Sequence, residues 1–242
     1  MQKFKLISII IPIYNEEKTV KKVLEKLIKI KFPLKKEIIC IDDGSIDNSA
    51  DIINNFINKN KEEKIYYFYK RNQGKGSAVR LGLKKSKGDI LAIQDADLEY
   101  EPEDLKKMIQ LILKGNAKAV YGSRYLSEKG HLKENDTITF RIHKIGNNLL
   151  SFLTTILYLQ NITDMETCYK MFTREVYKKI HLYLNDFGIE AEITAKIRKL
   201  GYRIKEVPIN YFSRDFREGK KITWKDGLKA LFYLIKFRFF DK

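Results

Sequence analysis

The chain has 242 residues, of which 44% are hydrophobic and 12% aromatic, so it can bury a substantial core and is neither intrinsically disordered nor fibrous. Its 47 Lys and Arg exceed its 31 Asp and Glu and give a net charge of +16. A charge of this size indicates an anionic partner, for which nucleic acid, an anionic membrane face and a phosphorylated substrate are the candidates.

The first half of the sequence alternates short apolar runs with helical patterns. Five β-branched runs predict strands at residues 6–13, 37–41, 64–69, 90–94 and 117–121. The spacing of apolar residues predicts helices at residues 16–30, 49–57 and 105–113. Pro102, between Glu101 and Glu103, marks the start of the third of these helices. The alternation predicts an α/β domain with a mostly parallel central sheet.

The second half of the sequence has longer helical patterns and fewer strands. The patterns predict a long amphipathic helix at 139–159, a strand at 167–172, a helix at 189–200 and a strand at 204–211. The polar loop at 127–136 is too short to separate two domains. The sequence therefore predicts a single domain over residues 1–242.

Residues 224–240 combine aromatic and basic side chains. Basic side chains interrupt the apolar run too often for a membrane span, at Lys225, Lys229, Lys236 and Arg238. We expect an amphipathic helix that lies on an anionic membrane surface, and we expect removal of the residues after Tyr233 to weaken that binding. The alternative is a helix that covers the core with Leu228, Leu231 and Leu234.

The two cysteines and the N-terminal apolar run bear on the cellular compartment. Cys40 and Cys168 lie far apart without the spacing of metal ligands, so we expect two buried, reduced thiols and a cytosolic location. The apolar run at 7–13 is short and contains Pro12, which indicates a core strand rather than a secretory signal.

Polar side chains follow three of the predicted strands, at residues 14–16, 42–45 and 95–97. Each segment alone would be interpreted as a capped turn between a strand and a helix. Ligands of parallel α/β sheets bind beyond the carboxyl ends of the strands, and these segments would meet at that edge. Together they predict a binding site.

Three carboxylates follow the fourth predicted strand, on Asp95, Asp97 and Glu99. In extended backbone a spacing of two residues directs side chains to the same side, so we expect the three to converge. Converging carboxylates repel one another unless a cation is present, and their hard oxygens suit Mg²⁺ or Mn²⁺ together with phosphate oxygens.

A glycine-rich loop at 71–77 follows the third predicted strand and opens a helix. Its glycines would let the backbone approach a ligand, while Lys75 and Arg80 supply positive charge. The loop lacks the spacing of a Walker A motif, which disfavours a nucleoside triphosphatase.

With these motifs assembled, the chain resembles an inverting glycosyltransferase of family 2, and within that family the polyprenyl-phosphate hexose synthases that make dolichyl-phosphate mannose or glucose. The resemblance is carried, in order along the chain, by Ile-Ile-Pro-Ile-Tyr-Asn-Glu at 10–16, Asp-Asp-Gly-Ser at 42–45, the loop at 74–80, Asp-Ala-Asp at 95–97, Gly-Ser-Arg-Tyr at 122–125, Thr-Asp at 163–164 and Glu-Val-Pro-Ile at 206–209.

The resemblance implies a Rossmann-like fold of the GT-A type. It also implies that different parts of the single catalytic domain bind the donor and the acceptor. Residues 1–125 would form the nucleotide-sugar-binding half, 126–222 the acceptor-binding half and 223–242 the C-terminal amphipathic helix. The residues implied to bind the nucleotide sugar are Pro12, Tyr14, Glu16, Asp43, Gly74, Lys75, Arg80, Asp95 and Ala96.

The resemblance also implies the catalytic residues. Asp97 would serve the metal-bound diphosphate with Asp95, and Asp164 would lie beside the reacting sugar. Arg124 and Arg141 would clamp the phosphate of the acceptor. Three further basic residues would close over the diphosphate or the acceptor: Arg214, Arg217 and Lys220. An acceptor phosphate is already anionic, so its attack on the anomeric carbon needs little help from a base.

The expected function is therefore transfer of a hexose from GDP-mannose or UDP-glucose to a polyprenyl or dolichyl phosphate, with inversion and with Mg²⁺ or Mn²⁺. The protein would lie on the cytoplasmic face of a membrane, held by anionic lipid or by a separate membrane subunit. The alternative is transfer to a saccharide hydroxyl in cell-surface polysaccharide synthesis. A nucleic-acid-binding module is disfavoured because the sequence lacks a recognisable basic and aromatic motif.

Overall fold

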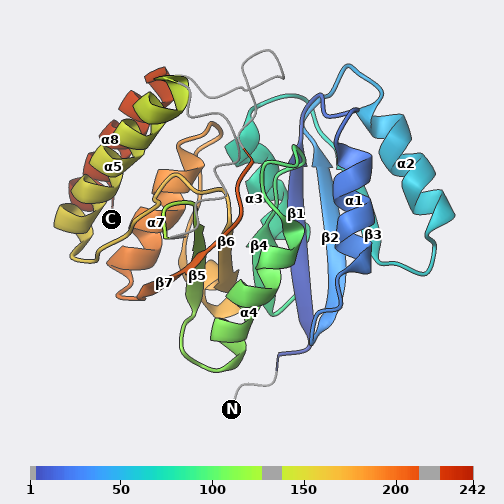
Figure 1. Cartoon of the computed structure of the whole chain (residues 1–242), viewed down its shortest axis with the longest axis horizontal. Coiled ribbons are helices and arrows are strands. Elements are labelled where there is room, and N and C mark those ends of the chain that lie inside the picture. Colours follow the sequence, from blue (N-terminus) through green and yellow to red (C-terminus); the bar gives the residue numbers. More distant parts are fainter. Residues whose placement is uncertain (1–3, 127–137, 213–223, 242) are drawn as a thin grey trace.

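The structure, a computed structural model, describes residues 4–126, 138–212 and 224–241. Seven strands form one sheet in the order β3-β2-β1-β4-β6-β5-β7 (Figure 1). The strands are β1 (Leu6–Ile13), β2 (Lys35–Asp42), β3 (Ile65–Tyr69), β4 (Ile90–Ile93), β5 (Ala119–Ser123), β6 (Lys170–Thr173) and β7 (Ile204–Pro208).

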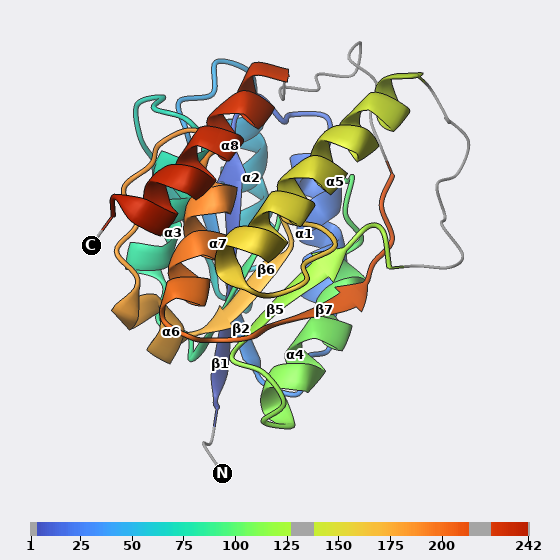
Figure 2. The same ribbon diagram turned by 90° about the vertical axis from the view of Figure 1, so that its left-hand side faces the viewer.

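Helices cover both faces of the sheet. They are α1 (Val20–Lys29), α2 (Ser49–Lys59), α3 (Lys75–Lys85), α4 (Leu105–Leu113), α5 (Ile138–Tyr158), α6 (Arg174–Lys179), α7 (Ile189–Lys199) and α8 (Trp224–Phe239), with a 3₁₀ turn at Pro102–Asp104 before α4. One face packs against α1, α2 and α4, and the other packs against α3 and α7, with α5 and α8 outside α7 (Figure 2).

The central strand β1 is buried on both faces, which explains its unbroken apolar sequence. Ile9 and Ile11 belong to the core beneath α1 and α4, whereas Ile10 packs with Val79 and Leu83 of α3. All three isoleucines are fully buried. The strand predicted at 6–13 is therefore confirmed, and so is the mostly parallel sheet.

Strand β6 is antiparallel to both of its neighbours, β4 and β5, while the other pairs in the sheet are parallel. It comes from the second half of the chain but lies between two strands of the first half. The segment that precedes β6 therefore reaches the same edge of the sheet as the carboxyl ends of β4 and β5.

Three predicted boundaries are wrong by three or four residues, each for a local reason. The strand predicted at 167–172 is shorter and begins at Lys170, because residues 163–169 form a hydrogen-bonded turn. The last strand ends at Pro208, which lacks an N–H for the ladder. The first helix begins at Val20 rather than Glu16, whose carbonyl closes a preceding turn.

Helix α6 (Arg174–Lys179) was not predicted, although the sequence carries its signals. The side chain of Thr173 caps the helix by accepting a hydrogen bond from the N–H of Val176. Glu175 lies in the first turn and Lys178 and Lys179 in the last, as the helix dipole favours.

The expected state of the cysteines is confirmed, since Cys40 and Cys168 are both free and buried. Within the described ranges, no helix combines the length and the apolarity needed to cross a bilayer.

Candidate active site

The carboxyl ends of β1, β2, β4 and β5 lie at one edge of the sheet, toward the top of Figure 1. Strand order reverses between β1 and β4, and such a reversal opens a crevice where α/β sheets bind ligands. This edge brings together Asp43, Asp95, Asp97 and Arg124 from the first half of the chain. The antiparallel β6 adds Asp164, so residues from both halves share one site.

A largely buried charge cluster lies beneath this edge, formed by Lys75, Asp95, Cys168, Lys170 and Glu190; we call it the Lys75 cluster. The Nζ of Lys75 lies 2.8 Å from Asp95 Oδ1, 2.8 Å from Cys168 Sγ and 3.4 Å from Glu190 Oε1. Glu190 in turn lies 2.7 Å from the Nζ of Lys170, whose side chain is fully buried. The cluster joins α3, the end of β4, the start of β6 and α7.

The Lys75 cluster shifts the pKa of two of its members, Lys75 and Cys168. Burial alone would lower the pKa of Lys75, but the charges of Asp95 and Glu190 raise it well above its ordinary value. Burial and the nearby carboxylate of Asp95 raise the pKa of the Cys168 thiol well above its ordinary value. Lys75 is therefore a cation and Cys168 a neutral thiol, which makes Cys168 a structural residue rather than a nucleophile.

Arg124 and Asp164 form a bidentate ion pair at the end of β5. The guanidinium donates from Nε to Oδ2 and from Nη2 to Oδ1, both at 2.7 Å, and the backbone N–H of Arg124 donates to Oδ2 at 3.0 Å. Asp164 is fully buried. Burial would lower the pKa of Arg124, but Asp164 raises it well above its ordinary value, so the guanidinium stays charged.

Glu206 in β7 fastens the turn that carries Asp164. Its carboxylate accepts hydrogen bonds from the backbone N–H groups of Thr163, at 2.9 and 3.0 Å, and of Asp164, at 3.1 Å. The hydroxyl of Thr163 also lies 2.6 Å from that of Ser123. Glu206 belongs to a motif that carried the resemblance, and the structure assigns it this positioning role.

The three carboxylates predicted to hold a metal are not arranged as expected. Strand β4 ends at Ile93, and Leu98 has a φ of +64°, so the backbone turns and Glu99 does not continue the row of Asp95 and Asp97. Glu99 instead accepts a hydrogen bond from the hydroxyl of Tyr211 at 2.9 Å. In the part of the chain that the structure describes, no three acidic, Cys or His side chains are grouped for metal binding.

Asp95 and Asp97 nevertheless fit a divalent cation that is shared with a ligand. Both side chains are partly exposed at the end of β4. Mg²⁺ and Mn²⁺ accept hard carboxylate oxygens, and Mg²⁺ usually takes one or two protein carboxylates and fills its other positions with phosphate oxygens and water. A pair of carboxylates is sufficient for that arrangement, with a diphosphate completing the coordination.

The glycine-rich loop packs against the backbone of residues 184–186. A Cβ added to Gly74, which has a φ of +100°, would lie 2.5 Å from the carbonyl oxygen of Asn185, and one on Gly76 would lie 2.6 Å from that of Leu184. The N–H of Gly74 donates to Asp43 Oδ2 at 2.7 Å, and Lys70 pairs with the other oxygen. These glycines therefore allow close backbone packing, and Asp43 holds the loop in place.

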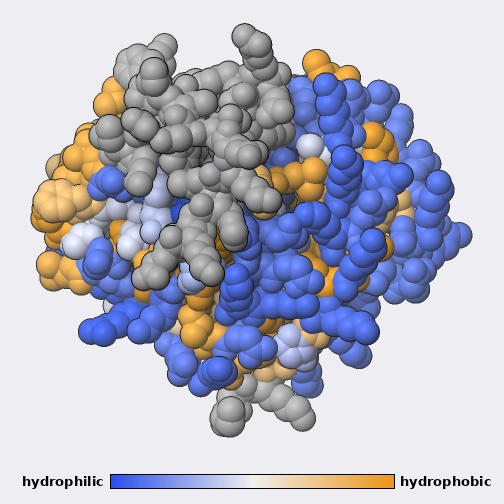
Figure 3. All heavy atoms as spheres, in the orientation of Figure 1, coloured by the Kyte–Doolittle hydropathy of each residue, from blue (hydrophilic) through white to orange (hydrophobic). Residues whose placement is uncertain are grey.

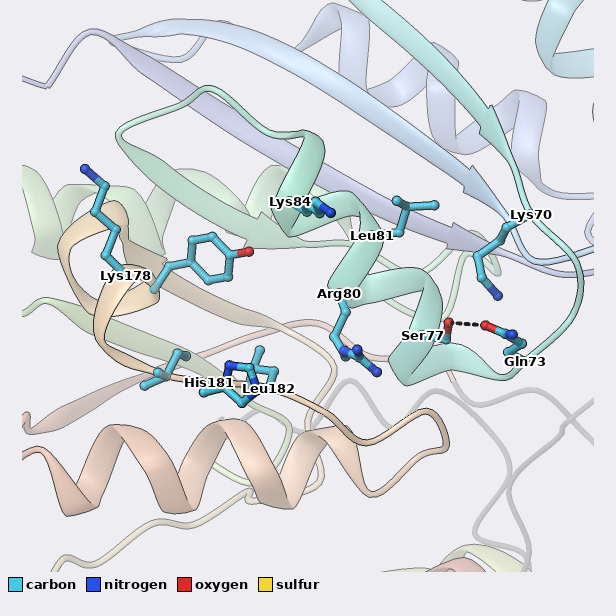
Figure 4. A pocket seen from close by; sticks show the side chains of 11 residues that line it. Lys70, Gln73, Ser77, Arg80, Leu81, Lys84, Lys178, His181 and Leu182 are labelled. Atoms are coloured by element: carbon cyan, nitrogen blue, oxygen red, sulfur yellow. Dashed lines mark hydrogen bonds between the residues drawn. The ribbon is translucent and has the colours of Figure 1, made fainter. Parts of the chain in front are cut away.

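Arg80 in α3 contacts the segment that precedes α7. It lines a basic pocket of ≈ 590 Å³ between α3 and the segment around His181, together with Lys70, Lys84 and Lys178 (Figure 4). Its guanidinium donates to the carbonyl of Tyr183 at 2.8 Å and to Asn185 Oδ1 at 2.7 Å. It therefore anchors the 183–185 segment against α3.

The residues after β1 follow a strand that ends at the same edge of the sheet. Tyr14 has 36% of its surface exposed, whereas Glu16 is buried and accepts a hydrogen bond from the hydroxyl of Thr19. Pro12 lies beyond the part of β1 that pairs with β4, so its missing N–H costs that pair nothing. Ala96 is buried between Asp95 and Asp97.

Four predicted acceptor residues cannot be placed. Arg141 lies in α5, but its side chain lies outside the described part of the chain. Arg214, Arg217 and Lys220 all lie outside the described residues. Their predicted roles stay predictions.

Glu166, which lies on the same turn as Asp164, was not predicted as a site residue. Its Oε1 atom is buried without a hydrogen-bond partner. Burial, assisted by the charges of Glu190 and Asp164, raises its pKa to about 7, although Lys170 and Arg124 oppose the change. A glutamate within a turn gives no sequence signal of this kind, because its environment comes from distant elements.

The chain is similar in sequence to several known proteins. The sequence model of glycosyl transferase family 2 matches residues 8–181. The UDP-N-acetylglucosamine–dolichyl-phosphate N-acetylglucosaminyltransferase of Methanococcus voltae is 32% identical over 249 residues, covering 96% of this chain and 95% of that protein. The dolichyl-phosphate beta-glucosyltransferase of Dictyostelium discoideum is 31% identical over 228 residues, covering 86% of this chain and 67% of that protein.

Among solved structures, a similar fold occurs in glucosyl-3-phosphoglycerate synthase from Mycobacterium tuberculosis, crystallised with Mn²⁺, UDP and phosphoglyceric acid. The TM-score is 0.71 at 19% identity, covering 97% of this chain and 79% of that chain. This likeness confirms the predicted GT-A-type fold.

The ion pair predicts that Arg124→Ala lowers stability as well as activity. Removal of the guanidinium leaves the Asp164 carboxylate buried and uncompensated, so we expect the free energy of unfolding to fall by about 3–5 kcal/mol. Urea denaturation measures the change, with the exposed Arg203→Ala as control. An unchanged urea midpoint for Arg124→Ala would show that the pair contributes nothing to folding.

The raised pKa of Glu166 predicts a pH-dependent effect of Glu166→Gln. The proton on Glu166 stabilises the fold fully below its ordinary pKa of 4.5, and this stabilisation is lost as the pH rises through about 7. Glutamine cannot ionise, so the variant should gain stability over the natural chain across this window, by up to roughly 3 kcal/mol. Urea midpoints at acidic and alkaline pH test this, with the exposed Glu62→Gln as control; a pH-independent difference would contradict it.

Proposed function

The chain belongs to glycosyl transferase family 2, and we propose that it transfers a sugar from a nucleoside diphosphate sugar to a polyprenyl phosphate such as dolichyl phosphate, with inversion at the anomeric carbon. Both named relatives use dolichyl phosphate according to their names. The name of the Methanococcus voltae protein also specifies a UDP-sugar, so we favour a UDP-sugar donor over GDP-mannose.

The observation that supports this proposal is that the charged Arg124 lies at the same edge of the sheet as Asp95 and Asp97. Tyr211 connects Arg124 to the segment after Asp97, because its ring lies 5.1 Å from the Arg124 guanidinium and its hydroxyl donates to Glu99. Asp164 occupies two of the five N–H donors of Arg124, which leaves others for a phosphate. An acceptor phosphate held there would face a sugar diphosphate held near Asp97.

The reaction requires two anionic groups to approach one another. An oxygen of the acceptor phosphate attacks the anomeric carbon and forms the new C–O bond, while the bond to the nucleoside diphosphate breaks on the opposite face. Arg124 orients the attacking phosphate, and the positive charge of Lys75 lies beneath the leaving diphosphate. A divalent cation held by Asp95 and Asp97 would supply additional charge stabilisation to the leaving group.

A hydroxyl acceptor, as in polysaccharide synthesis, is the alternative. A hydroxyl must lose its proton to a base as it attacks, and Asp164 was the carboxylate expected beside the sugar. Both oxygens of Asp164 already accept hydrogen bonds from Arg124. This arrangement favours a phosphate acceptor, which brings its own negative charge.

The proposal extends to the organisation of the chain and to its place in the cell. Residues 1–125 would bind the donor and 126–222 the acceptor, with Arg141, Arg214, Arg217 and Lys220 supplementing Arg124. A polyprenyl phosphate keeps its phosphate at the membrane surface, so the enzyme would work as a peripheral protein on the cytoplasmic face, alone or with a separate membrane subunit.

A donor panel tests the function directly. The purified chain is incubated with polyprenyl phosphate, Mn²⁺ or Mg²⁺ and radiolabelled UDP-glucose, UDP-N-acetylglucosamine or GDP-mannose, and the label in the organic phase is counted. We expect one UDP-sugar to label the lipid, and we expect no product with the unphosphorylated polyprenol as control. Label that stays in water and appears on a saccharide acceptor would establish the alternative.

The metal assignment predicts the effect of Asp97→Ala. Loss of one of two carboxylate ligands leaves the charge on the departing diphosphate uncompensated, so we expect turnover to fall at least about 100-fold. Mn²⁺ binding in the presence of UDP, measured by calorimetry, should weaken in parallel, and EDTA should inactivate the natural chain. Asp95→Ala is a less specific variant because Asp95 also pairs with Lys75.

The exposed Glu103→Ala serves as the matched control and should leave both turnover and Mn²⁺ binding unchanged. The assignment is wrong if Asp97→Ala retains more than about a tenth of the natural turnover, or if EDTA has no effect.

A further inference from the structure

The basic pocket between α3 and the segment around His181 has no part in the proposed reaction. Its volume of about 590 Å³ is within the range of pockets that hold small molecules, roughly 300–1,000 Å³. Four of its lining residues are cationic: Lys70, Arg80, Lys84 and Lys178. No Asp or Glu is found among its described lining residues. We call it the Arg80 pocket.

Helix geometry separates the Arg80 pocket from the Lys75 cluster. Ser77, Arg80 and Lys84 line the pocket and are spaced by three and four residues, which puts them on one face of α3. Lys75 lies about 140–200° around the helix from them. Its side chain contacts Asp95, whereas the side of α3 that carries Arg80 contacts residues 183 and 185. The pocket is therefore a place distinct from the carboxylates at the end of β4.

Arg80 is the cation that the structure holds in place. Its Nη1 donates to the carbonyl of Tyr183 at 2.8 Å and to Asn185 Oδ1 at 2.7 Å, and its side chain points from α3 toward His181 and Leu182 (Figure 4). Both acceptors are neutral, so they do not compensate its charge. The N–H groups of Nε and Nη2 take no part in these two hydrogen bonds. A guanidinium held in this way is preorganised to bind a phosphate with two parallel donors.

The charges of the pocket fit two joined phosphates better than one. Lys70 already pairs with Asp43. Lys84 and Lys178 are exposed, and neither forms an ion pair with any residue that the structure describes. Together with Arg80 they give three cations without a carboxylate partner. A phosphate group carries about −1.5 to −2 at neutral pH, so a single phosphate would leave part of this charge uncompensated, whereas a diphosphate would match it.

Surface charge alone does not distinguish the Arg80 pocket. Hydrophilic side chains also gather over α1 and α2, at the right of Figure 3. On that surface, Lys21 pairs with Glu25 and Lys26 pairs with Glu101. The pocket differs in two respects, because its cations line a hollow and because its described lining contains no carboxylate to neutralise them.

We propose that the Arg80 pocket binds the diphosphate group of a small molecule, at a site separate from that of the sugar donor. Arg80 binds one phosphate with its two remaining donor nitrogens, and Lys84 and Lys178 neutralise the rest of the charge. The buried Ile180 and Leu182 add an apolar part to the wall, against which an organic group on the diphosphate can pack. Inorganic pyrophosphate and a nucleoside diphosphate share this chemistry. The inference does not depend on the proposed function.

The test variant removes the exposed cations and leaves Arg80 in place. Arg80→Ala would also release the segment that this arginine anchors, so we choose Lys84→Ala/Lys178→Ala. The matched control is Lys22→Ala/Lys59→Ala. It removes the same two charges from exposed positions in α1 and α2, on the other face of the sheet.

Calorimetry with inorganic pyrophosphate in EDTA gives the primary measurement, since without metal the carboxylates of Asp95 and Asp97 would repel a diphosphate. The natural chain should bind pyrophosphate at least about tenfold more tightly than inorganic phosphate, and less tightly at high salt. The test variant should bind pyrophosphate at least about tenfold more weakly, and the control should bind it like the natural chain. Urea midpoints and the Mn²⁺-dependent binding of UDP should be the same in all three.

Equal pyrophosphate affinity in the test variant and the natural chain would overturn the proposal. An absence of binding to the natural chain would also overturn it, as would an equal loss in the control, which would show a general effect of net charge. Equal affinities for phosphate and pyrophosphate would exclude a diphosphate site.

Titration with ADP identifies the source of the diphosphate. If ADP binds as tightly as pyrophosphate and is weakened equally in the test variant, the pocket accepts a nucleotide-like ester. If pyrophosphate binds and ADP does not, the ligand is the inorganic ion. The donor panel is scored separately, so failure of the proposed function would leave these results unaffected.

Discussion

The ammonium of Lys75 is the point on which the arrangement of the site depends. It is buried where four elements meet, and its contacts with Asp95, Cys168 and Glu190 replace the water that a lysine normally holds. Because each partner comes from a different element, the positions of β4, the approach to β6 and α7 are fixed relative to α3. Removal of the ammonium would take away the positive charge that Asp95 and Glu190 both contact, and largely buried carboxylates tolerate such a loss poorly.

The antiparallel strand β6 explains how two halves of the chain build one site. A strand that ran parallel to β4 would have placed the preceding turn, with Asp164 and Glu166, at the opposite edge of the sheet. Its reversed direction puts that turn beside Arg124, where Glu206 and Ser123 hold it. The turn that carries Asp164 is therefore held to the same sheet as Asp95 and Asp97.

Features of the fold and the site that depend on neighbouring residues could be predicted from the sequence. Features that depend on residues far apart in the chain could not. The apolar run of β1 and the acidic strand end at Asp95 and Asp97 follow from neighbouring residues. The turn at Leu98, which removes Glu99 from the row of carboxylates, has no such signal, since leucine rarely adopts a positive φ. Contacts such as that of Lys75 with Cys168, 93 residues away, arise only once the sheet is assembled.

Helices α5 and α8 pack together outside α7 and leave Phe152 and Phe232 exposed, so the way the enzyme would meet a lipid acceptor depends on whether this surface rests on a bilayer. A protein held on a bilayer searches for a membrane lipid in two dimensions, and the lipid is concentrated in a layer only a few nanometres thick. Confinement of this kind raises the effective concentration of the acceptor without any new contact at the site. The individual interactions of Arg124 with a phosphate could then be weak and still saturate, which would allow rapid release of the lipid product.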